Sequence, residues 1–423
     1  METENLKPLS SFIFIPLIFF IFLRPFISGL TYPAFEIYYE SFIISTAIAT
    51  LFFSACLVRP KNAAQAKTQA GPRANAYILP ALLLLSSYII STATSVNIHN
   101  SAKETLKFLS YISIFFIISQ ANDRQKATLI KTIVVAASII SLYSVYQYFW
   151  GYQHTIDYIR KTDSRLLSIS SYTRDILLSK RAIGTFPSPN ILGGYLLMAF
   201  FLSLYTYFSS RKVYPEGSRR PSQEMLSVIP IVIILAALVL TKSLGAWLSL
   251  IFTLIILTVI MYDDFKKQKW LIYSSCIFIF LVLVFILSSR WERLMNLTNP
   301  QNSIIQRLNY WSTAIGTIKD HPFLGVGAGN FQEVFLKYKV GLSANTRYAH
   351  NIFLHQWAET GMLGFAGIFF MIFNLLRRKL KNTGDKFIFL AAIAFILHNM
   401  IDNAYFMPET GILLWVLLAI LSF

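Results

Sequence analysis

The sequence predicts an all-α integral membrane protein: a bundle of about twelve transmembrane helices with a large, partly helical outer loop. Of its 423 residues, 55% are hydrophobic and only 13% are charged, whereas a soluble domain has about 25% charged residues. The chain also contains a series of apolar runs close to the roughly 20 residues that a helix needs to cross a bilayer. Its 36 Phe and 22 Tyr residues are typical of proteins with aromatic side chains at membrane interfaces.

Twelve apolar segments are candidate membrane spans. They are 10–23, 38–58, 77–93, 104–119, 128–150, 184–208, 226–241, 244–261, 271–288, 352–376, 386–401 and 408–423. The first ends at Arg24-Pro25 rather than at a small-residue cleavage site, which favours a retained span over a signal peptide. Gly and Pro interrupt the start of the sixth span at 184–190, and membranes tolerate such breaks where the backbone is buried in protein.

Four short loops rich in Lys and Arg predict the orientation: 59–76, 209–225, 262–270 and 377–386. With an even number of spans, these loops share one side with both termini. An excess of Lys and Arg in short loops marks the cytoplasmic side. We therefore expect both termini in the cytoplasm.

Two longer loops, 151–183 and 289–351, are then expected on the outer side. The predicted organisation is 1–288 with helices 1 to 9 and the first outer loop, 289–351 as the periplasmic loop, and 352–423 with helices 10 to 12. Both outer loops are basic, which long loops are free to be. This charge is either a solvated surface near anionic headgroups or a site for an anion such as a lipid pyrophosphate.

The second outer loop begins with a predicted amphipathic helix over 303–319, where apolar residues recur at helical spacing. Ser303 with Gln306 predicts a capping box, and His321-Pro322 ends the helix. Arg307 lies in its first turn, either on a solvated face or as an anion ligand.

A glycine-rich stretch follows at 325–330. It lacks the preceding strand of a dinucleotide fingerprint and the Lys-Ser/Thr of a Walker loop. We expect these glycines to let a turn pack tightly against the bundle. The alternative is a nest of backbone N–H groups for phosphate.

His350 ends the outer loop where the tenth span begins, with Arg347 before it and Asn351 after it. It is either an interfacial residue or a general base, since a neutral imidazole suits proton removal from a sugar hydroxyl. His355 is interpreted as a packing residue. His398 and Asp402, at the outer end of the eleventh span, either orient a helix end or line the same cavity.

The sequence predicts neither a cofactor nor a metal site, because it has no His-Glu-x-x-His or paired-Cys pattern. Its two cysteines, Cys56 and Cys276, lie in apolar runs and are interpreted as packing residues.

The segments 320–331, 347–351 and 359–364 together resemble the conserved block of the O-antigen ligase and O-antigen polymerase superfamily, and most closely the ligases. The resemblance is strongest over 306–365 and extends weakly to Arg181 with the Gly-Thr-Phe after it, to 241–247, and to His398 with Asp402. It implies a glycosyltransferase of the bacterial inner membrane that acts on undecaprenyl-pyrophosphate-linked glycans at the periplasmic face.

Carried onto this chain, the resemblance implies that His350 is the catalytic base, supported by Asn351, His398 and Asp402. Basic side chains are the candidate ligands of the donor pyrophosphate: Arg181, Arg290, Arg307, Arg347 and Lys242. Lys242 is included because the family's Ser-Arg-Gly hairpin is Ser243-Leu244-Gly245 here, and Lys242 is the nearest cation.

The function expected on this basis is metal-independent, inverting transfer of a glycan from undecaprenyl pyrophosphate to the sugar of lipid A–core. The expected partners are this donor, this acceptor and membrane lipids, with no nucleic acid. The first alternative is an O-antigen polymerase that joins lipid-linked repeat units. Broken helices also fit a membrane transporter, although the polar groups gather at the outer boundary rather than at the midplane. A non-catalytic membrane scaffold is the remaining alternative.

Overall fold

The computed structural model describes residues 11–27, 74–162, 180–213, 221–262 and 302–422, together with 177, 277, 284, 288, 291 and 295–300. All regular structure in these residues is helical. The predicted span 38–58 and nearly all of 271–288 lie outside the described residues, as do Cys56, Cys276 and Arg290.

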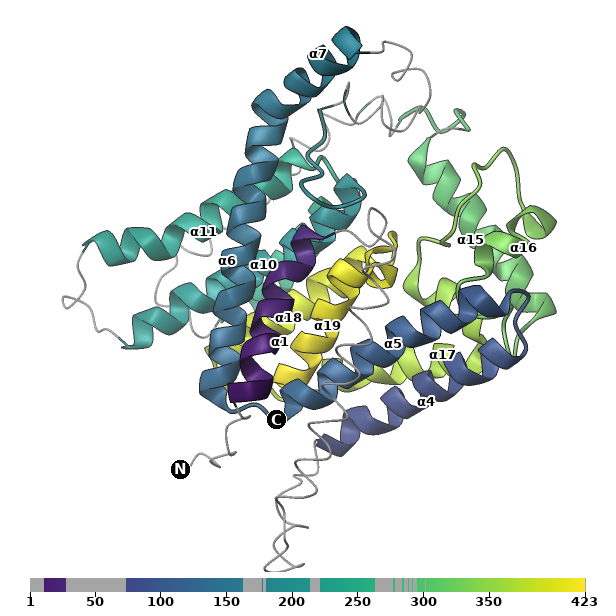
Figure 1. The fold of residues 1–423 in the computed structure, drawn as a ribbon, viewed down its shortest axis with the longest axis horizontal. Coiled ribbons are helices and arrows are strands. Elements are labelled where there is room, and N and C mark those ends of the chain that lie inside the picture. Colours follow the sequence, from purple (N-terminus) through teal and green to yellow (C-terminus); the bar gives the residue numbers. More distant parts are fainter. Residues whose placement is uncertain are drawn as a thin grey trace, which may run out of the picture.

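The helices follow the chain in an order close to the predicted one (Figure 1). They are α1 (Ser11–Leu23), α4 (Ala74–Ala93), α5 (Ile98–Ser119), α6 (Asp123–Tyr146), α7 (Tyr152–Thr162), α10 (Pro189–Val213), α11 (Pro221–Leu240), α12 (Leu244–Ile260), α15 (Ser303–Asp320), α16 (Phe331–Tyr338), α17 (Ile352–Leu376), α18 (Thr383–His398) and α19 (Pro408–Leu421), with short turns η1 (Arg24–Phe26), η2 (Gln147–Gly151) and η3 (Ala404–Phe406).

Four helices of the described chain are long and apolar enough to cross a membrane: α4, the continuous helix from α6 to α7, α10 and α17. Four shorter apolar helices accompany them: α1, α11, α12 and α19. The prediction of an all-helical membrane protein is therefore confirmed in its coarse form. The total of twelve spans stays a prediction.

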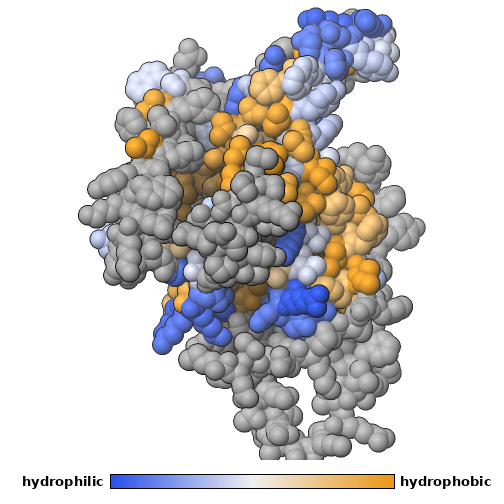
Figure 2. Space-filling view, turned by 90° about the vertical axis from the view of Figure 1, so that its left-hand side faces the viewer, coloured by the Kyte–Doolittle hydropathy of each residue, from blue (hydrophilic) through white to orange (hydrophobic). Residues whose placement is uncertain are grey.

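The outward face of the second half of α6 is apolar, as expected of a helix that contacts lipid. Val135, Ile139 and Leu142 are 52%, 44% and 54% exposed. In a protein surrounded only by water, burial of these side chains would be more favourable. Figure 2 shows hydrophobic side chains across the middle of one face and hydrophilic ones toward its opposite ends. This distribution is typical of a protein embedded in a bilayer.

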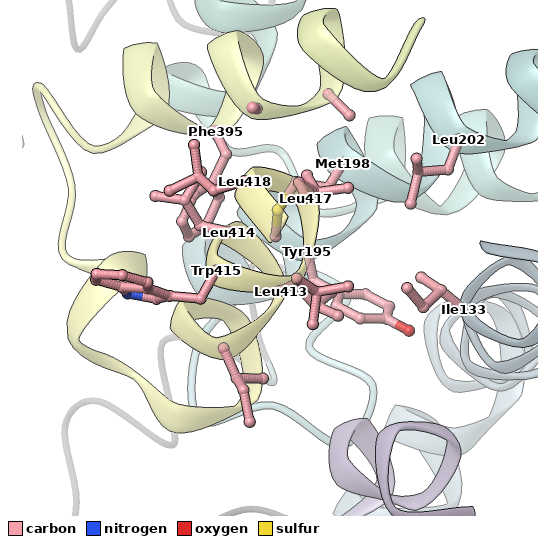
Figure 3. Packing of buried hydrophobic residues seen from close by; sticks show 14 of the residues in the cluster. Ile133, Tyr195, Met198, Leu202, Phe395, Leu413, Leu414, Trp415, Leu417 and Leu418 are labelled. Carbon is pink, nitrogen blue, oxygen red and sulfur yellow. The ribbon is translucent and has the colours of Figure 1, made fainter. Parts of the chain in front are cut away.

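The centre of the bundle is formed by α10, α18 and α19, most of whose described residues are buried. Figure 3 shows their side chains meeting around Trp415 and Phe395. Trp415 also packs edge-on against Phe108 and Phe115 of α5, with ring centroids 5.5 and 6.0 Å apart. This core holds the loop between α18 and α19 at one end of the bundle.

The predicted outer loop 151–183 begins as helix rather than as loop. α6 continues through the π-helical turn η2 into α7, so the helix runs unbroken from Asp123 to Thr162. The Gln147 side chain in this turn accepts the N–H groups of Ile183 and Gly184, at 3.1 and 2.9 Å. The π turn therefore anchors the segment that leads into α10.

α17 is broken at Gly361, where the sequence predicts an uninterrupted span. Gly361 has φ +70° and ψ −168°, and a Cβ there would lie 2.0 Å from the Phe323 carbonyl oxygen. The loop before α16 fills the break: Met362 N–H donates to Pro322, while Ala358 and Glu359 carbonyls accept from Val326 and Gly327. The outer loop is thus hydrogen-bonded into the helix, which satisfies the backbone groups that the break frees.

Candidate functional site

Three segments meet at the outer-loop end of the bundle: the α18–α19 loop, the turn before α17, and α15 (Figure 1). Asn302, not the predicted Ser303, caps α15, since its side chain accepts the Ile304 N–H at 2.9 Å. The predicted capping box is therefore wrong. The Gln306 side chain instead accepts the Ala344 N–H and so ties the loop between α16 and α17 to α15.

His350 lies in the turn before α17 with a left-handed backbone, φ +54°. Its ring stacks on Tyr310 of α15, with centroids 5.5 Å apart. Its carbonyl accepts a hydrogen bond of 3.4 Å from the Trp311 indole N–H. The side chain is 22% exposed, so the imidazole is accessible to a substrate.

Asp402 is the acidic centre of the site. Its side chain is 1% exposed and pairs with Arg307, Oδ2 to a guanidinium nitrogen at 3.0 Å. Its Oδ1 accepts the Asn403 N–H at 2.9 Å and lies 3.9 Å from Nδ1 of His350. The Arg307 guanidinium and the His350 imidazole thus lie on either oxygen of one buried carboxylate.

Arg307 is held in the site through all of its guanidinium nitrogens. Besides Asp402 it donates to the Ile401 carbonyl at 2.5 Å and to the Ser303 carbonyl at 3.2 Å. These bonds join α15 to the α18–α19 loop. Arg307 therefore has a defined position rather than lying on a solvated helix face.

Burial and the neighbouring charges shift the pKa values of His350 and Asp402. Burial lowers the pKa of His350 to about 4, against the opposing effect of the Asp402 carboxylate. Burial alone raises the pKa of Asp402, but His398, Arg307, His350 and the Asn403 N–H together lower it below its ordinary value. At neutral pH the site therefore combines a neutral imidazole with an ionised carboxylate.

A second group of predicted residues lies around His398, which acts on the Asp402 carboxylate electrostatically. Arg181 donates to the Asn190 side chain at 2.9 Å and to the Thr241 carbonyl at 3.0 Å, and the Asn190 carbonyl lies 3.0 Å from Nε2 of His398. A Cβ at Gly194 or Gly245 would crowd the His398 ring, at 2.9 and 3.2 Å. These two glycines therefore make room for the imidazole.

Lys242 lies at the α11–α12 turn beside Arg181. It has a left-handed backbone, φ +49°, and its amino group is 5.3 Å from the centroid of the Tyr148 ring. The turn itself is tied to Arg181 by the Thr241 carbonyl. Lys242 is thus placed next to one of the predicted arginines.

Arg347 belongs to a different cluster. Its guanidinium pairs with Glu104 of α5 at 2.9 Å, and its side chain is 42% exposed. Glu104 also pairs with Lys107, whose amino group donates to the Phe406 carbonyl at 2.9 Å. The structure therefore places Arg347 on a carboxylate that the sequence analysis did not single out.

Asn351 caps α17. Its side-chain oxygen accepts the N–H groups of Phe353 and Leu354, both at 3.0 Å, and its amide donates to the Met400 carbonyl. Asn351 therefore fixes the turn of His350 to the α18–α19 loop.

The glycine-rich turn packs on Glu359 of α17, as the sequence predicts for tight packing against the bundle. The Glu359 carboxylate accepts the N–H groups of Gly329 at 2.8 Å and Phe331 at 3.1 Å. The backbone N–H groups suggested for phosphate are thus taken by an internal anion. Sequence reasoning missed Glu359 as their partner, because nothing in the spacing of 325–330 and 359 shows that they meet.

The structure brings His350, Asp402, Arg307 and Asn351 into one cluster, with His398 and Arg181 connected to it. It places Lys242 beside Arg181 and Arg347 on Glu104, and it does not describe Arg290. Tyr310, Asn190, Glu104 and Glu359 are polar partners that the sequence analysis missed. Apart from Arg181, which is nine positions from Asn190, their partners lie far away in the chain, and only tertiary structure shows the contacts.

Comparison with known proteins found one family match. Residues 229–369, about one third of the chain, match the family model described as O-antigen ligase. A comparison with curated proteins gave no match. The matched segment contains α15, the glycine-rich turn, His350 and the broken helix α17 up to Phe369. This third of the chain is therefore similar to the O-antigen ligase family, and the match supports the O-antigen ligase/polymerase superfamily. Members of the matched family are glycosyltransferase-like enzymes.

Proposed function

We propose that this protein is an O-antigen ligase of the bacterial inner membrane, with both termini in the cytoplasm and its site facing the periplasm. It transfers a glycan from undecaprenyl pyrophosphate to a sugar hydroxyl of lipid A–core. The hydroxyl oxygen attacks the anomeric carbon on the face opposite the pyrophosphate. The bond between that carbon and the phosphate oxygen breaks, the lipid pyrophosphate leaves with the electron pair, and the configuration inverts.

His350 takes the proton of the attacking hydroxyl on Nε2. Its Nδ1 is directed at the Asp402 carboxylate at 3.9 Å, a distance that a bound substrate can shorten, since catalytic hydrogen bonds are often long in the free enzyme. This pair supports the role because the carboxylate stabilises the imidazolium that forms and selects the tautomer with a proton on Nδ1. General-base assistance contributes roughly 10²–10⁴-fold in rate.

Arginines neutralise the leaving pyrophosphate in this mechanism. Arg307 and Arg181 are the nearest candidates, because their contacts connect both to the Asp402–His398 region. Lys242 and Arg347 complete the proposed set within the described residues, and Arg290 is included from the sequence alone. Fixed cations suit this task because they meet the charge that develops on the leaving group without reorganisation. We propose no metal ion or cofactor, and activity is expected to persist in EDTA.

The observation that carries the proposal is the partly exposed His350 beside a buried Asp402–Arg307 pair, within the matched family segment. The decisive test uses the purified full-length protein in lipid with an undecaprenyl-pyrophosphate glycan. Glycan transfer is assayed with and without lipid A–core. Transfer that requires lipid A–core supports ligation, and an absence of any transfer with both substrates contradicts the proposal.

The polymerase is the second candidate, since the superfamily includes both activities and they use the same donor. A polymerase needs a second lipid-linked glycan as acceptor instead of lipid A–core. Deletion of the gene separates the two in the host. Accumulated lipid-linked polymer with unmodified lipid A–core indicates a ligase, whereas accumulated single repeat units indicate a polymerase.

A further inference from the structure

His350 has a backbone conformation that a non-glycine residue rarely adopts. At φ +54° the Cβ atom crowds the following carbonyl, so the surrounding structure must hold the turn in place. On its C-terminal side the turn is held by Asn351, which caps α17, and by the Ile352 N–H, which donates to Asn399 at 2.8 Å. The N-terminal side needs an anchor of its own.

His355 supplies that anchor. Its Nδ1 accepts the N–H of Ala349, the residue directly before His350, at 3.4 Å. Ala349 is fully buried, so this N–H has no access to water. The bond therefore holds the Tyr348–Ala349 peptide, one residue before His350, against the His355 ring.

Glu359 fixes the His355 ring from its other nitrogen. Nε2 of His355 lies 3.4 Å from Oε2 of Glu359, and the His355 side chain is 1% exposed. Because Nδ1 accepts from Ala349, the proton of the neutral ring is on Nε2 and is directed at Glu359. The rings of Phe406 and Tyr348 pack edge-on against it, with centroids 4.3 and 5.3 Å away.

Glu359 is itself held in place by the glycine-rich turn, through the N–H groups of Gly329 and Phe331. A chain of contacts thus runs from that turn through Glu359 and His355 to the Tyr348–Ala349 peptide, directly before His350. Phe331, Glu359, His355 and Ala349 are all buried, so these contacts are shielded from water.

We propose that His355, oriented by Glu359, is a positioning residue for His350. It does not touch substrate. It keeps the His350 imidazole over Tyr310 and beside Asp402 by holding the Ala349 N–H. The inference rests on the proposed role of His350 as general base.

The test compares three replacements of His355 in the full-length protein in lipid. In His355→Asn the side-chain oxygen takes the place of Nδ1 and still accepts from Ala349. In His355→Gln the amide reaches toward Glu359 but loses the Ala349 bond. His355→Ala loses both. His99→Gln, in the exposed first turn of α5, is the matched control for a histidine replaced outside the site.

We expect kcat to fall about 10- to 100-fold in His355→Ala and His355→Gln, because small displacements of a catalytic group are costly. His355→Asn should recover most of this loss, and KM for the donor should stay within about twofold in all three. A packing role predicts instead that Gln and Asn lose activity alike, in step with their thermal stability. That result, or wild-type kcat in all three variants, overturns the proposal.

Hydrogen exchange gives a measurement that does not depend on activity. The peptide that contains residues 346–352 should exchange faster in His355→Gln than in wild type or His355→Asn, and unchanged exchange in His355→Gln contradicts the positioning role. His350→Ala separates this inference from the proposed function. If His350→Ala is fully active, the general-base role itself fails, whereas inactive His350→Ala with fully active His355 variants refutes only the positioning role.

Discussion

Two buried carboxylates on the outer-loop side of the protein each face a histidine, yet the two pairs differ in what they leave open. Asp402 lies 3.9 Å from His350, whose side chain is 22% exposed. Glu359 lies 3.4 Å from His355, whose side chain is 1% exposed and whose other nitrogen is occupied by Ala349. The first pair keeps one imidazole nitrogen for a substrate, and the second uses both nitrogens to hold the protein together.

The surroundings of the two carboxylates explain this difference. Asp402 faces a cation and two imidazoles, Arg307, His350 and His398, so it can compensate positive charge that develops on His350. Glu359 is turned toward backbone N–H groups of the glycine-rich turn, which fix its position. An acid–histidine pair thus serves proton transfer or positioning according to what else the acid contacts.

The largest expected effect is on His350. His350→Ala should lower turnover about 10²–10⁴-fold, because it removes the only group placed to take the hydroxyl proton in the proposed mechanism. The measurement is glycan transfer by purified protein in lipid, with membrane insertion and thermal unfolding checked on the same samples. Near-wild-type turnover would show that His350 is an interfacial residue.

Asp402→Asn is expected to follow, with kcat reduced roughly 10²-fold or more. Asn keeps the shape but not the charge, so His350 loses the group that selects its tautomer and stabilises its protonated form. Glu359→Gln should be milder, at about tenfold, since it acts on His350 only through His355. Steady-state kcat for both variants tests the order, and equal losses would remove the distinction between the two pairs.

Substitutions of two outer-loop arginines, Arg307 and Arg347, should also differ in the size of their effects. Arg307→Lys should lower kcat/KM about tenfold or more, because Lys cannot make the three bonds that the guanidinium makes to Asp402, Ile401 and Ser303. Arg347→Lys should change it no more than about threefold, since Arg347 pairs with Glu104 at a site 42% exposed. The reverse order would move the donor site toward Glu104.

Much of this architecture follows from local pattern. Apolar runs locate the helices, and the end of α15 at His321 agrees with the predicted stop. The break in α17 does not follow, because Gly361 sits in an apolar run and becomes a break only where the loop around Phe323 supplies hydrogen bonds. The periodicity of apolar residues predicts that this segment is helical, but it does not predict which loop inserts into the helix.

The site shows the same division. The His350-Asn351 junction is visible in sequence because it lies where a polar loop enters a span. The pairing of Arg347 with Glu104 is not, since the two residues are 243 positions apart and Glu104, at the start of the predicted span 104–119, already has Lys107 of its own helix beside it. A charge inside a span is a signal for a buried partner, although it does not say which cation will meet it.

The smallest expected effect is on pH dependence. Because burial lowers the pKa of His350 to about 4, about nine-tenths of it stays neutral at pH 5, against roughly 3% for a histidine of ordinary pKa. Between pH 7 and pH 5, kcat/KM should therefore change less than about twofold. This parameter reports the free enzyme, before the anionic donor can raise the pKa again. A fall centred near pH 6.5 would mean that water reaches His350 more freely than the structure indicates.

Stability must be followed in the same samples, because the same shift acts on folding. Between pH 6.5 and about 4, His350 is protonated in the unfolded chain and neutral in the folded protein. The free energy of unfolding therefore falls as the pH is lowered through this window. Asp402, whose pKa lies below its ordinary value, lowers the free energy of unfolding further only at lower pH.

The variant Asp402→Asn sharpens the test, because the Asp402 carboxylate that it removes raises the pKa of His350. Any acid limb of kcat/KM that His350 causes should therefore move to still lower pH in that variant, whereas a limb caused by unfolding follows the thermal stability instead.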